Sequence, residues 1–206
     1  MLYVVYGRDR AGAGPTRRAL LKDHWAFMTP YIDAMVARGP TMSEDGKVVT
    51  GSLHVVDLAD AAAVRTFAED DPLAKGGVFD EVVIRRFDNL TGRTMWQFHG
   101  DADNPRFLFV GEADAVPDVQ ADGIVAAQRT LLARPEAAPA VIVAGPLLDP
   151  ESGNWRGTAV LLEAPDRASA EWLLTADPAA SLYDRATLHR WRFGGAENLQ
   201  DLVSPA

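Results

Sequence analysis

The chain has 206 residues, of which 48% are hydrophobic and 24% are charged, as in folded proteins of one large or two small domains. The absence of cysteine excludes disulfides, thiolate metal sites and a cysteine nucleophile, and it fits a reducing cytoplasm. The net charge of −9 repels nucleic acid and anionic membranes, and no apolar run approaches the ~20 residues that span a bilayer. We therefore expect a cytoplasmic protein whose partners include neither nucleic acid nor membrane.

The first half of the chain predicts the order β-α-β-β-α-β, which is the ferredoxin-like unit. Strands are expected over residues 2–6, 51–58 and 79–87, and helices over 16–36 and 61–69. Pro30 is expected to kink or restart the first helix. Asp60 can cap the second helix, and Asp71-Pro72 should end it.

The second half repeats the first with one offset. Gly39-Pro40 recurs as Gly145-Pro146, which lies 106 positions later (145 − 39). The same offset pairs Leu2–Val4 with Leu108–Val110, Gly51 with Gly157, Asp71-Pro72 with Asp177-Pro178, and Arg86-Phe87 with Arg192-Phe193. Strands are then expected over 107–111, 141–144, 157–163 and 186–193, and helices over 123–133 and 167–176. We interpret the pattern as an old tandem duplication.

The repeat divides the chain into four parts. These are an amino-terminal domain over residues 1–88, a linker over 89–105, a degenerate carboxy-terminal domain over 106–193, and a tail over 194–206. A four-stranded sheet with helices on one face leaves its other face bare, so we expect the two halves to pack sheet to sheet. The apolar "MWQF" of the linker favours packing as well.

Several segments together resemble the YCII-related (YciI-like) family. They are the first strand "LYVVY", the "DHWAFM" helix segment with its histidine, the "RGPT" turn, the "TGSLHVVD" strand, "DDPLAKGGVF" and the closing "VVIRRF". The resemblance implies an α+β fold in which two ferredoxin-like (βαββαβ) domains form a pseudo-dimeric α+β barrel. Members of the family usually dimerise, which a tandem repeat would mimic within one chain. Whether two chains also form a homodimer is left open.

The resemblance also implies a catalytic histidine–aspartate pair, which falls on His24 and Asp71 of this sequence. One characterised branch of the family eliminates chloride from a chlorinated hydroxyquinol. At the offset of 106, Thr130 stands where the first half has His24, whereas Asp177 matches Asp71. The first half would therefore be the active one.

The residues themselves leave a plainer alternative open for this pair. His24 could be a core histidine that bonds a carbonyl group, because a lone histidine on an apolar helix face is usually structural. Asp71 could simply cap the turn before Pro72, as the retention of Asp177 without a histidine suggests.

Five further residues are candidates for substrate binding. They are Tyr6, Trp25, Arg38, Ser52 and His54. The aromatic residues could stack on a planar substrate or belong to the core, and Arg38 could hold a carboxylate or lie solvated on the surface. His54 shares a strand face with Ser52, which could line a cleft or an interface between the halves. The histidines lack the spacing typical of metal ligands, so we expect neither a metal nor another cofactor.

The leading hypothesis is a cofactor-independent enzyme, a lyase or an isomerase, acting on a small-molecule substrate that could be aromatic. His24 would be the general base and Asp71 its orienting partner. Two alternatives stay open. One is a non-catalytic small-molecule binding or accessory module, and the other is a cofactor-free oxygenase of the dimeric α+β barrel type.

Overall fold

The computed structural model describes residues 1–114 and 116–194, so the predicted tail beyond Gly194 lies outside the described residues. The first half contains β1 (Leu2–Asp9), α1 (Gly14–Met28), η1 (Thr29–Ala34), β2 (Met35–Met42), β3 (Val49–Asp57), α2 (Ala61–Asp70), α3 (Pro72–Lys75) and β4 (Phe79–Phe87). After η2 (Met95–Gln97), the second half contains β5 (Arg106–Glu112), α4 (Asp118–Leu132), β6 (Val141–Leu148), β7 (Trp155–Glu163), α5 (Arg167–Thr175), η3 (Ala180–Leu182) and β8 (Arg185–Trp191). Both halves thus follow the predicted βαββαβ order.

The strands form one closed antiparallel barrel in the order β1-β3-β2-β8-β5-β7-β6-β4. Each half contributes four neighbouring strands, and the two sheets join at their edges. Thr41 of β2 pairs with Trp191 of β8 at one seam, and Leu147 of β6 pairs with Phe87 of β4 at the other. The predicted pseudo-dimeric α+β barrel is therefore confirmed.

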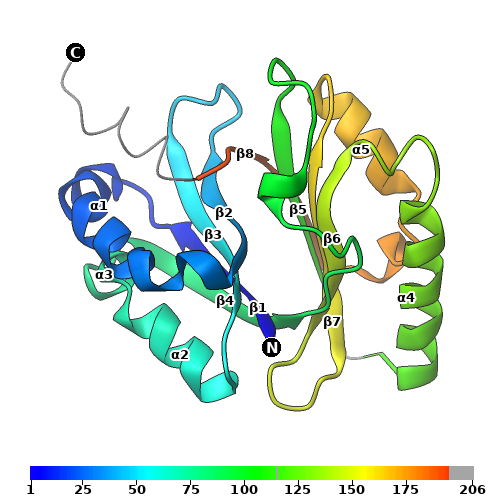
Figure 1. Ribbon diagram of the computed structural model, residues 1–206, viewed down its shortest axis with the longest axis horizontal. Coiled ribbons are helices and arrows are strands. Elements are labelled where there is room, and N and C mark those ends of the chain that lie inside the picture. Colours follow the sequence, from blue (N-terminus) through cyan, green and yellow to red (C-terminus); the bar gives the residue numbers. More distant parts are fainter. Residues whose placement is uncertain (115, 195–206) are drawn as a thin grey trace.

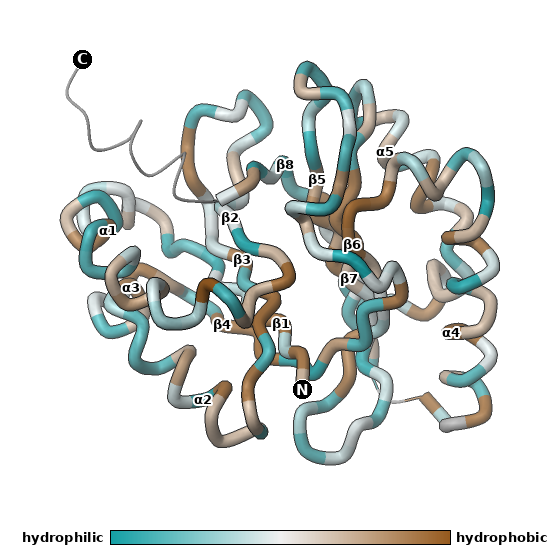
Figure 2. Tube along the Cα trace, in the orientation of Figure 1, coloured by the Kyte–Doolittle hydropathy of each residue, from teal (hydrophilic) through white to brown (hydrophobic). Residues whose placement is uncertain are grey.

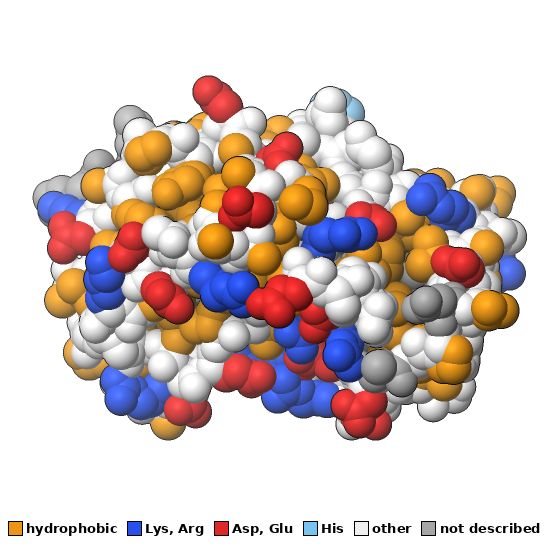
Figure 3. Space-filling view, turned by 90° about the horizontal axis from the view of Figure 1, so that it is seen from below, with side chains coloured by type: hydrophobic (Ala, Val, Ile, Leu, Met, Phe, Trp, Pro, Cys, Tyr) orange, Lys and Arg blue, Asp and Glu red, His pale blue; other side chains and the backbone are white. Residues whose placement is uncertain are grey.

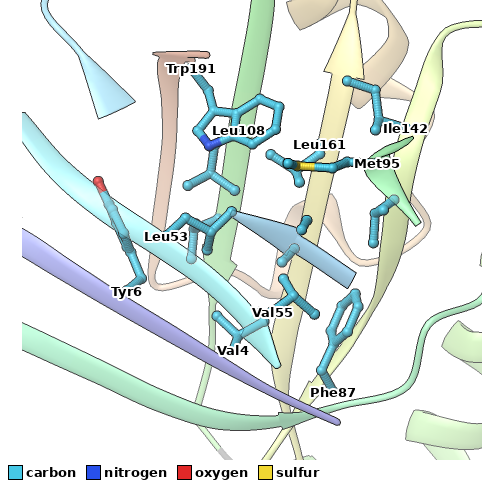
Figure 4. Packing of buried hydrophobic residues seen from close by; sticks show 14 of the residues in the cluster. Val4, Tyr6, Leu53, Val55, Phe87, Met95, Leu108, Ile142, Leu161 and Trp191 are labelled. Atoms are coloured by element: carbon cyan, nitrogen blue, oxygen red, sulfur yellow. The ribbon is translucent and has the colours of Figure 1, made fainter. Parts of the chain in front are cut away.

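The barrel interior is the largest hydrophobic core. Inward-facing residues from both halves meet there (Figure 4), among them Val4, Leu53, Val55, Phe87, Leu108, Ile142, Leu161 and Trp191. Met95 and Phe98 of the linker are buried in the same cluster, so this segment packs as expected. Because side chains alternate along a strand, the bare face of each sheet is covered by the other half.

The helices cover the outside of the barrel. Those of the first half lie on one side and those of the second half on the other (Figure 1). Figure 2 shows hydrophobic residues concentrated along the strands and hydrophilic ones in the connecting loops. Smaller apolar clusters join each sheet to its helices, such as the one around Tyr3, Val56 and Phe67. No helix in the described ranges is long and apolar enough to cross a bilayer.

Two local expectations were wrong. The first helix ends at Met28 rather than near Val36, because Pro30 removes a backbone donor and the chain continues as the 3₁₀ segment η1. The "RGPT" segment is not a turn, since Arg38–Thr41 lies within β2. Gly39 has φ 156° there, and a Cβ atom on it would lie 2.0 Å from the carbonyl oxygen of Arg192. Only glycine allows this close approach at the seam.

The single offset of 106 holds for part of the repeat only. It relates β2 to β6 and β3 to β7. On β1, however, Leu2 faces Asp57, whereas on β5 Arg106 faces Glu163. Since Glu163 is the equivalent of Asp57, Arg106 is the equivalent of Leu2, and the offset there is 104 (106 − 2). The pairing of Leu2–Val4 with Leu108–Val110 was therefore wrong.

The loop lengths explain the change of offset. Eight residues (133–140) separate α4 from β6, whereas six (29–34) separate α1 from β2. The offset of 104 returns on the last strand, where Trp191 occupies the seam position that Phe87 has in the first half. Arg86-Phe87 therefore corresponds to Arg190-Trp191 and not to Arg192-Phe193. On the first helix, Gln128 and not Thr130 is the equivalent of His24.

Candidate active site

The His24 and Asp71 side chains meet beneath the helices of the first half. Both are buried, and His24 Nδ1 lies 2.8 Å from Asp71 Oδ1. His24 is on the inner face of α1, together with Arg17 and Met28. Asp71 is the N-cap of α3, and its Oδ1 also accepts the backbone N–H of Leu73 at 2.9 Å. The position of His24 is thus set by helix α1, and the position of Asp71 is set by its role as the N-cap of α3.

This contact determines the tautomer of neutral His24. An ionised carboxylate can only accept hydrogen bonds, so Nδ1 must carry the proton that it shares with Asp71. The other ring nitrogen, Nε2, then keeps its lone pair. The arrangement is that of a histidine base oriented by a carboxylate.

Electrostatics keep Asp71 ionised despite its burial. Burial alone would raise the pKa of this carboxyl, but the hydrogen bond from His24, the charge of His24 and the Leu73 N–H outweigh it and lower the pKa. Asp71 is therefore available as a negative partner when His24 takes up a proton.

A second histidine adjoins the pair. The His54 ring lies 5.5 Å from the His24 ring, centroid to centroid, and 5.8 Å from the ring of Phe67. Complete burial, followed by the charge of nearby His24, lowers the pKa of His54 to about 3. His54 is thus uncharged at neutral pH, so it can donate or accept a hydrogen bond without adding a charge.

Arg17 and Asp9 belong to the same buried polar group, although the sequence did not indicate them. Arg17 Nε donates to Asp9 Oδ2 at 2.6 Å, and its Nη1 donates to Ser52 Oγ at 3.0 Å. The spacing could have revealed Arg17, because it precedes His24 by seven residues and so lies two turns earlier on the same helix face. Ser52 is therefore held by Arg17.

The other predicted binding residues do not gather around His24. Tyr6 points into the barrel interior (Figure 4), where its hydroxyl lies 3.4 Å from Thr41 Oγ1. It is on the opposite sheet face from His54, because Tyr6 pairs with Leu53. Trp25 is half-buried on α1, about 100° around the helix from its neighbour His24.

Arg38 is buried and not solvated at the surface. It pairs across the sheet with His54, its Nε donates to the carbonyl of Gly194 at 3.2 Å, and its guanidinium lies 5.9 Å from the ring centroid of Trp96. These contacts connect Arg38 to the linker and the end of the described chain. Arg38 is therefore held by contacts that do not involve His24.

The second half has the same backbone arrangement at the equivalent place but different side chains. Gln128 Nε2 donates to Asp177 Oδ1 at 3.2 Å and to Thr158 Oγ1 at 2.8 Å. Asp177 also accepts the hydroxyl of Tyr183, which stands where the first half has Phe79. The aspartate is thus retained in contact with an amide and a phenol, neither of which is a base near neutral pH.

A metal would need a denser ligand set. Over residues 1–114 and 116–194, no group of three or more His, Cys, Asp or Glu side chains is arranged to hold an ion. His24, Asp71 and His54 supply two imidazoles and one carboxylate, but Asp71 already shares its Oδ1 with His24 and Leu73.

The barrel of two ferredoxin-like halves defines a protein of the dimeric α+β barrel class, folded here from one chain. Residues 1–88 match the YCII family, described as "YCII-related domain". The match thus covers the amino-terminal half of this chain, including His24 and Asp71.

The chain is similar to several proteins of known sequence or structure. The protein YciI of Escherichia coli O6:H1 is 27% identical over 94 residues, which cover 42% of this chain and 96% of YciI. A 5-chloro-2-hydroxyhydroquinone dehydrochlorinase from Burkholderia phenoliruptrix is 29% identical, covering 43% of this chain and 94% of that chain, with a TM-score of 0.41. A mutant chlorite dismutase from Candidatus Nitrospira defluvii covers 98% of this chain and 95% of its own at 9% identity, with a TM-score of 0.59, and so shares the fold.

Proposed function

We propose that the protein is a cofactor-independent enzyme that moves a proton on a small, aromatic-type metabolite, with His24 as general base and Asp71 as its orienting partner. The observation that carries the proposal is the buried 2.8 Å contact between His24 Nδ1 and Asp71 Oδ1. A core histidine needs only a carbonyl acceptor. An ionised carboxylate instead stabilises the imidazolium that forms when Nε2 takes a proton.

The proposed reaction begins when His24 Nε2 removes an acidic C–H or O–H proton from the substrate. The electron pair left behind forms a new double bond. In an elimination it expels a leaving group such as chloride, and in an isomerisation it is reprotonated at another carbon by the His24 imidazolium. Asp71 carries the counter-charge throughout, and uncharged His54 can hold a substrate hydroxyl group.

The test uses chloride release from a chlorinated hydroxyquinol, together with deuterium uptake from D₂O into hydroxyquinols and β-dicarbonyl compounds. We expect His24→Gln to lower the rate by roughly 10²-fold or more, the usual contribution of a general base. His99→Gln is the matched control, since His99 is exposed in the linker. Equal rates for His24→Gln and the parent protein would refute the proposal.

Asp71→Asn tests the partner. We expect a loss of rate, because a neutral amide cannot stabilise the imidazolium that forms when His24 takes up a proton. Asp60→Asn is the control, because Asp60 caps α2 through the Ala63 N–H and contacts no histidine. Oxygen uptake that accompanies turnover, without chloride release or deuterium exchange, would instead favour an oxygenase.

A further inference from the structure

The second half contains a cleft at the position equivalent to the candidate active site. It lies between α4, α5 and the outer face of β6 and β7, and its volume is about 50 Å³. Its walls are aliphatic and include Leu131, Leu132, Val160, Leu162, Leu173 and Leu174. Gln128, Thr158 and Asp177 form its polar end.

Differences between the halves explain why there is space here. Leu131 stands where the first half has Phe27, Leu173 stands where it has Phe67, and Val160 stands where it has His54. In the first half, the rings of Phe27 and His54 both pack against the ring of Phe67. Three rings are thus replaced by smaller aliphatic side chains at one place, which leaves room for a ring from outside.

The polar end carries an unused hydrogen-bond acceptor. Gln128 is 5% exposed, and both hydrogens of its amide nitrogen are engaged by Thr158 and Asp177. Since the Asp177 carboxylate can only accept, the amide is oriented with nitrogen toward it. No donor among the described residues reaches Gln128 Oε1, although the atom is buried. A buried acceptor without a partner is costly, so a ligand that donates to it would be favoured.

We infer that this cleft is a second, non-catalytic binding site for a small neutral ligand with an apolar ring and one hydroxyl group, a phenol or a comparable alcohol. The ring would lie against the aliphatic walls, and the hydroxyl would donate to Gln128 Oε1. The carboxylate of Asp177 at the same end opposes an anionic ligand. This inference does not depend on the proposed function of the first half.

The experiment titrates the full chain with phenol and, separately, with toluene, which has a methyl group in place of the hydroxyl. Methyl resonances of Leu131, Val160 and Leu173 report binding by NMR. We expect saturable shifts with phenol and binding of toluene that is weaker by about five- to tenfold, the value of one hydrogen bond. Gln128→Leu should bring the two affinities together.

Two cavity-filling variants make the test decisive. Val160→Phe and Leu173→Phe restore rings to the cleft, and either one that keeps a cooperative melting transition should lose the phenol-induced shifts. The absence of saturable shifts in the parent protein would overturn the inference. So would equal binding of phenol and toluene, or binding that persists when both positions carry phenylalanine.

Discussion

His24 and Gln128 occupy equivalent positions on α1 and α4, and each contacts the aspartate of an Asp-Pro turn. One contact joins a carboxylate to a group that can take up a proton, and the other joins it to a neutral amide. The first half also packs an uncharged histidine, His54, beside the pair, where the second half has Val160. The chemical difference between the halves therefore rests on a few side chains in a shared backbone.

Burial of neutral His54 should make the protein acid-sensitive. The unfolded chain binds a proton at this residue below pH 6.5, whereas the folded chain does so only near pH 3, so stability falls as pH drops through this window. At pH 4.5 the cost is about 2–3 kcal/mol. His54→Val, which introduces the residue of the second half, should flatten the pH dependence of the free energy of unfolding measured with urea.

The matched control for this prediction is His99→Val at the exposed linker histidine. The folded state also lowers the pKa of Asp71, so the contribution of this residue to the free energy of unfolding is lost as pH falls. Asp71 is present in all three proteins and therefore affects their pH profiles alike. A His54→Val profile that runs parallel to the parent between pH 7 and pH 4.5 would contradict the prediction.

At the scale of elements, the seams of the barrel depend on close backbone contact. A Cβ atom at Gly39 would lie 2.0 Å from the Arg192 carbonyl oxygen, and one at Gly145 would lie 1.9 Å from that of Asp88. The two contacts are equivalent, and each lies where an edge strand of one half meets the end of the other half's last strand. The repeated Gly-Pro segment thus lies where the two halves of the barrel meet.

Gly39→Ala and Gly145→Ala should each destabilise the protein by several kcal/mol, because an added methyl group must push the strands apart at a seam. Gly123→Ala is the control. Gly123 lies within α4 with no atom near its would-be Cβ, so alanine should stabilise by about 0.5–1 kcal/mol. Urea unfolding measures all three. Seam variants as stable as the parent would contradict this role.

At the scale of the whole molecule, the two halves are joined by charges as well as by strands. Arg8 Nη2 lies 2.9 Å from Glu112 Oε2, and Arg185 Nη2 lies 2.9 Å from Glu81 Oε1. At the offset of 104, Arg8 corresponds to Glu112 and Glu81 to Arg185, so the charges are reversed between the halves. Figure 3 shows acidic and basic side chains interspersed on the face that it presents. Two identical halves would bring like charges together, which favours pairing within one chain.

A charge swap tests this arrangement. Arg8→Glu should lower the free energy of unfolding by about 1–2 kcal/mol. Exchanging all four charges (Arg8→Glu, Glu81→Arg, Glu112→Arg and Arg185→Glu) should recover a large part of it, because Arg8 and Arg185 each contact both glutamates. The recovery should shrink in 1 M salt, which screens the interaction. A fourfold variant that is no more stable than Arg8→Glu would show that the four charges do not couple.

The sequence predicted much of the architecture for identifiable reasons. Strand and helix periods indicated the full βαββαβ unit in the second half but did not indicate β2 in the first, and the Gly-Pro and Asp-Pro repeats revealed the duplication. The shift from 106 to 104 was not predicted, because the Gly-Pro and Asp-Pro dipeptides lie between the two changes in loop length. Short matches at the ends of the repeat, such as "LYV" with "LFV", fit the offset of 106 by coincidence. Only the strand register of the structure shows that Gln128, and not Thr130, occupies the position equivalent to His24.

The candidate site was predicted in part. Contact between His24 and Asp71 requires α1 and α3 to converge, which the family resemblance implied and local sequence could not show. Tyr6 is a candidate for substrate binding because it ends the predicted first strand. The alternation of side chains along the strand, however, directs it into the barrel interior. The sequence did not indicate the Arg17–Asp9 ion pair, because a charged side chain inside a helix–sheet interface is rare, although the spacing of Arg17 from His24 places the two on one helix face.

The central claim is that Asp71 holds neutral His24 with its proton on Nδ1 and its lone pair on Nε2. Long-range ¹H–¹⁵N NMR of the imidazole nitrogens, in the parent protein and in Asp71→Ala, measures this tautomer directly. We expect a protonated Nδ1 and an unprotonated Nε2 in the parent, and a shift of the proton toward Nε2 in Asp71→Ala, which removes the acceptor of Nδ1. A parent protein with its proton on Nε2, or a tautomer that does not change in the variant, would contradict the claim.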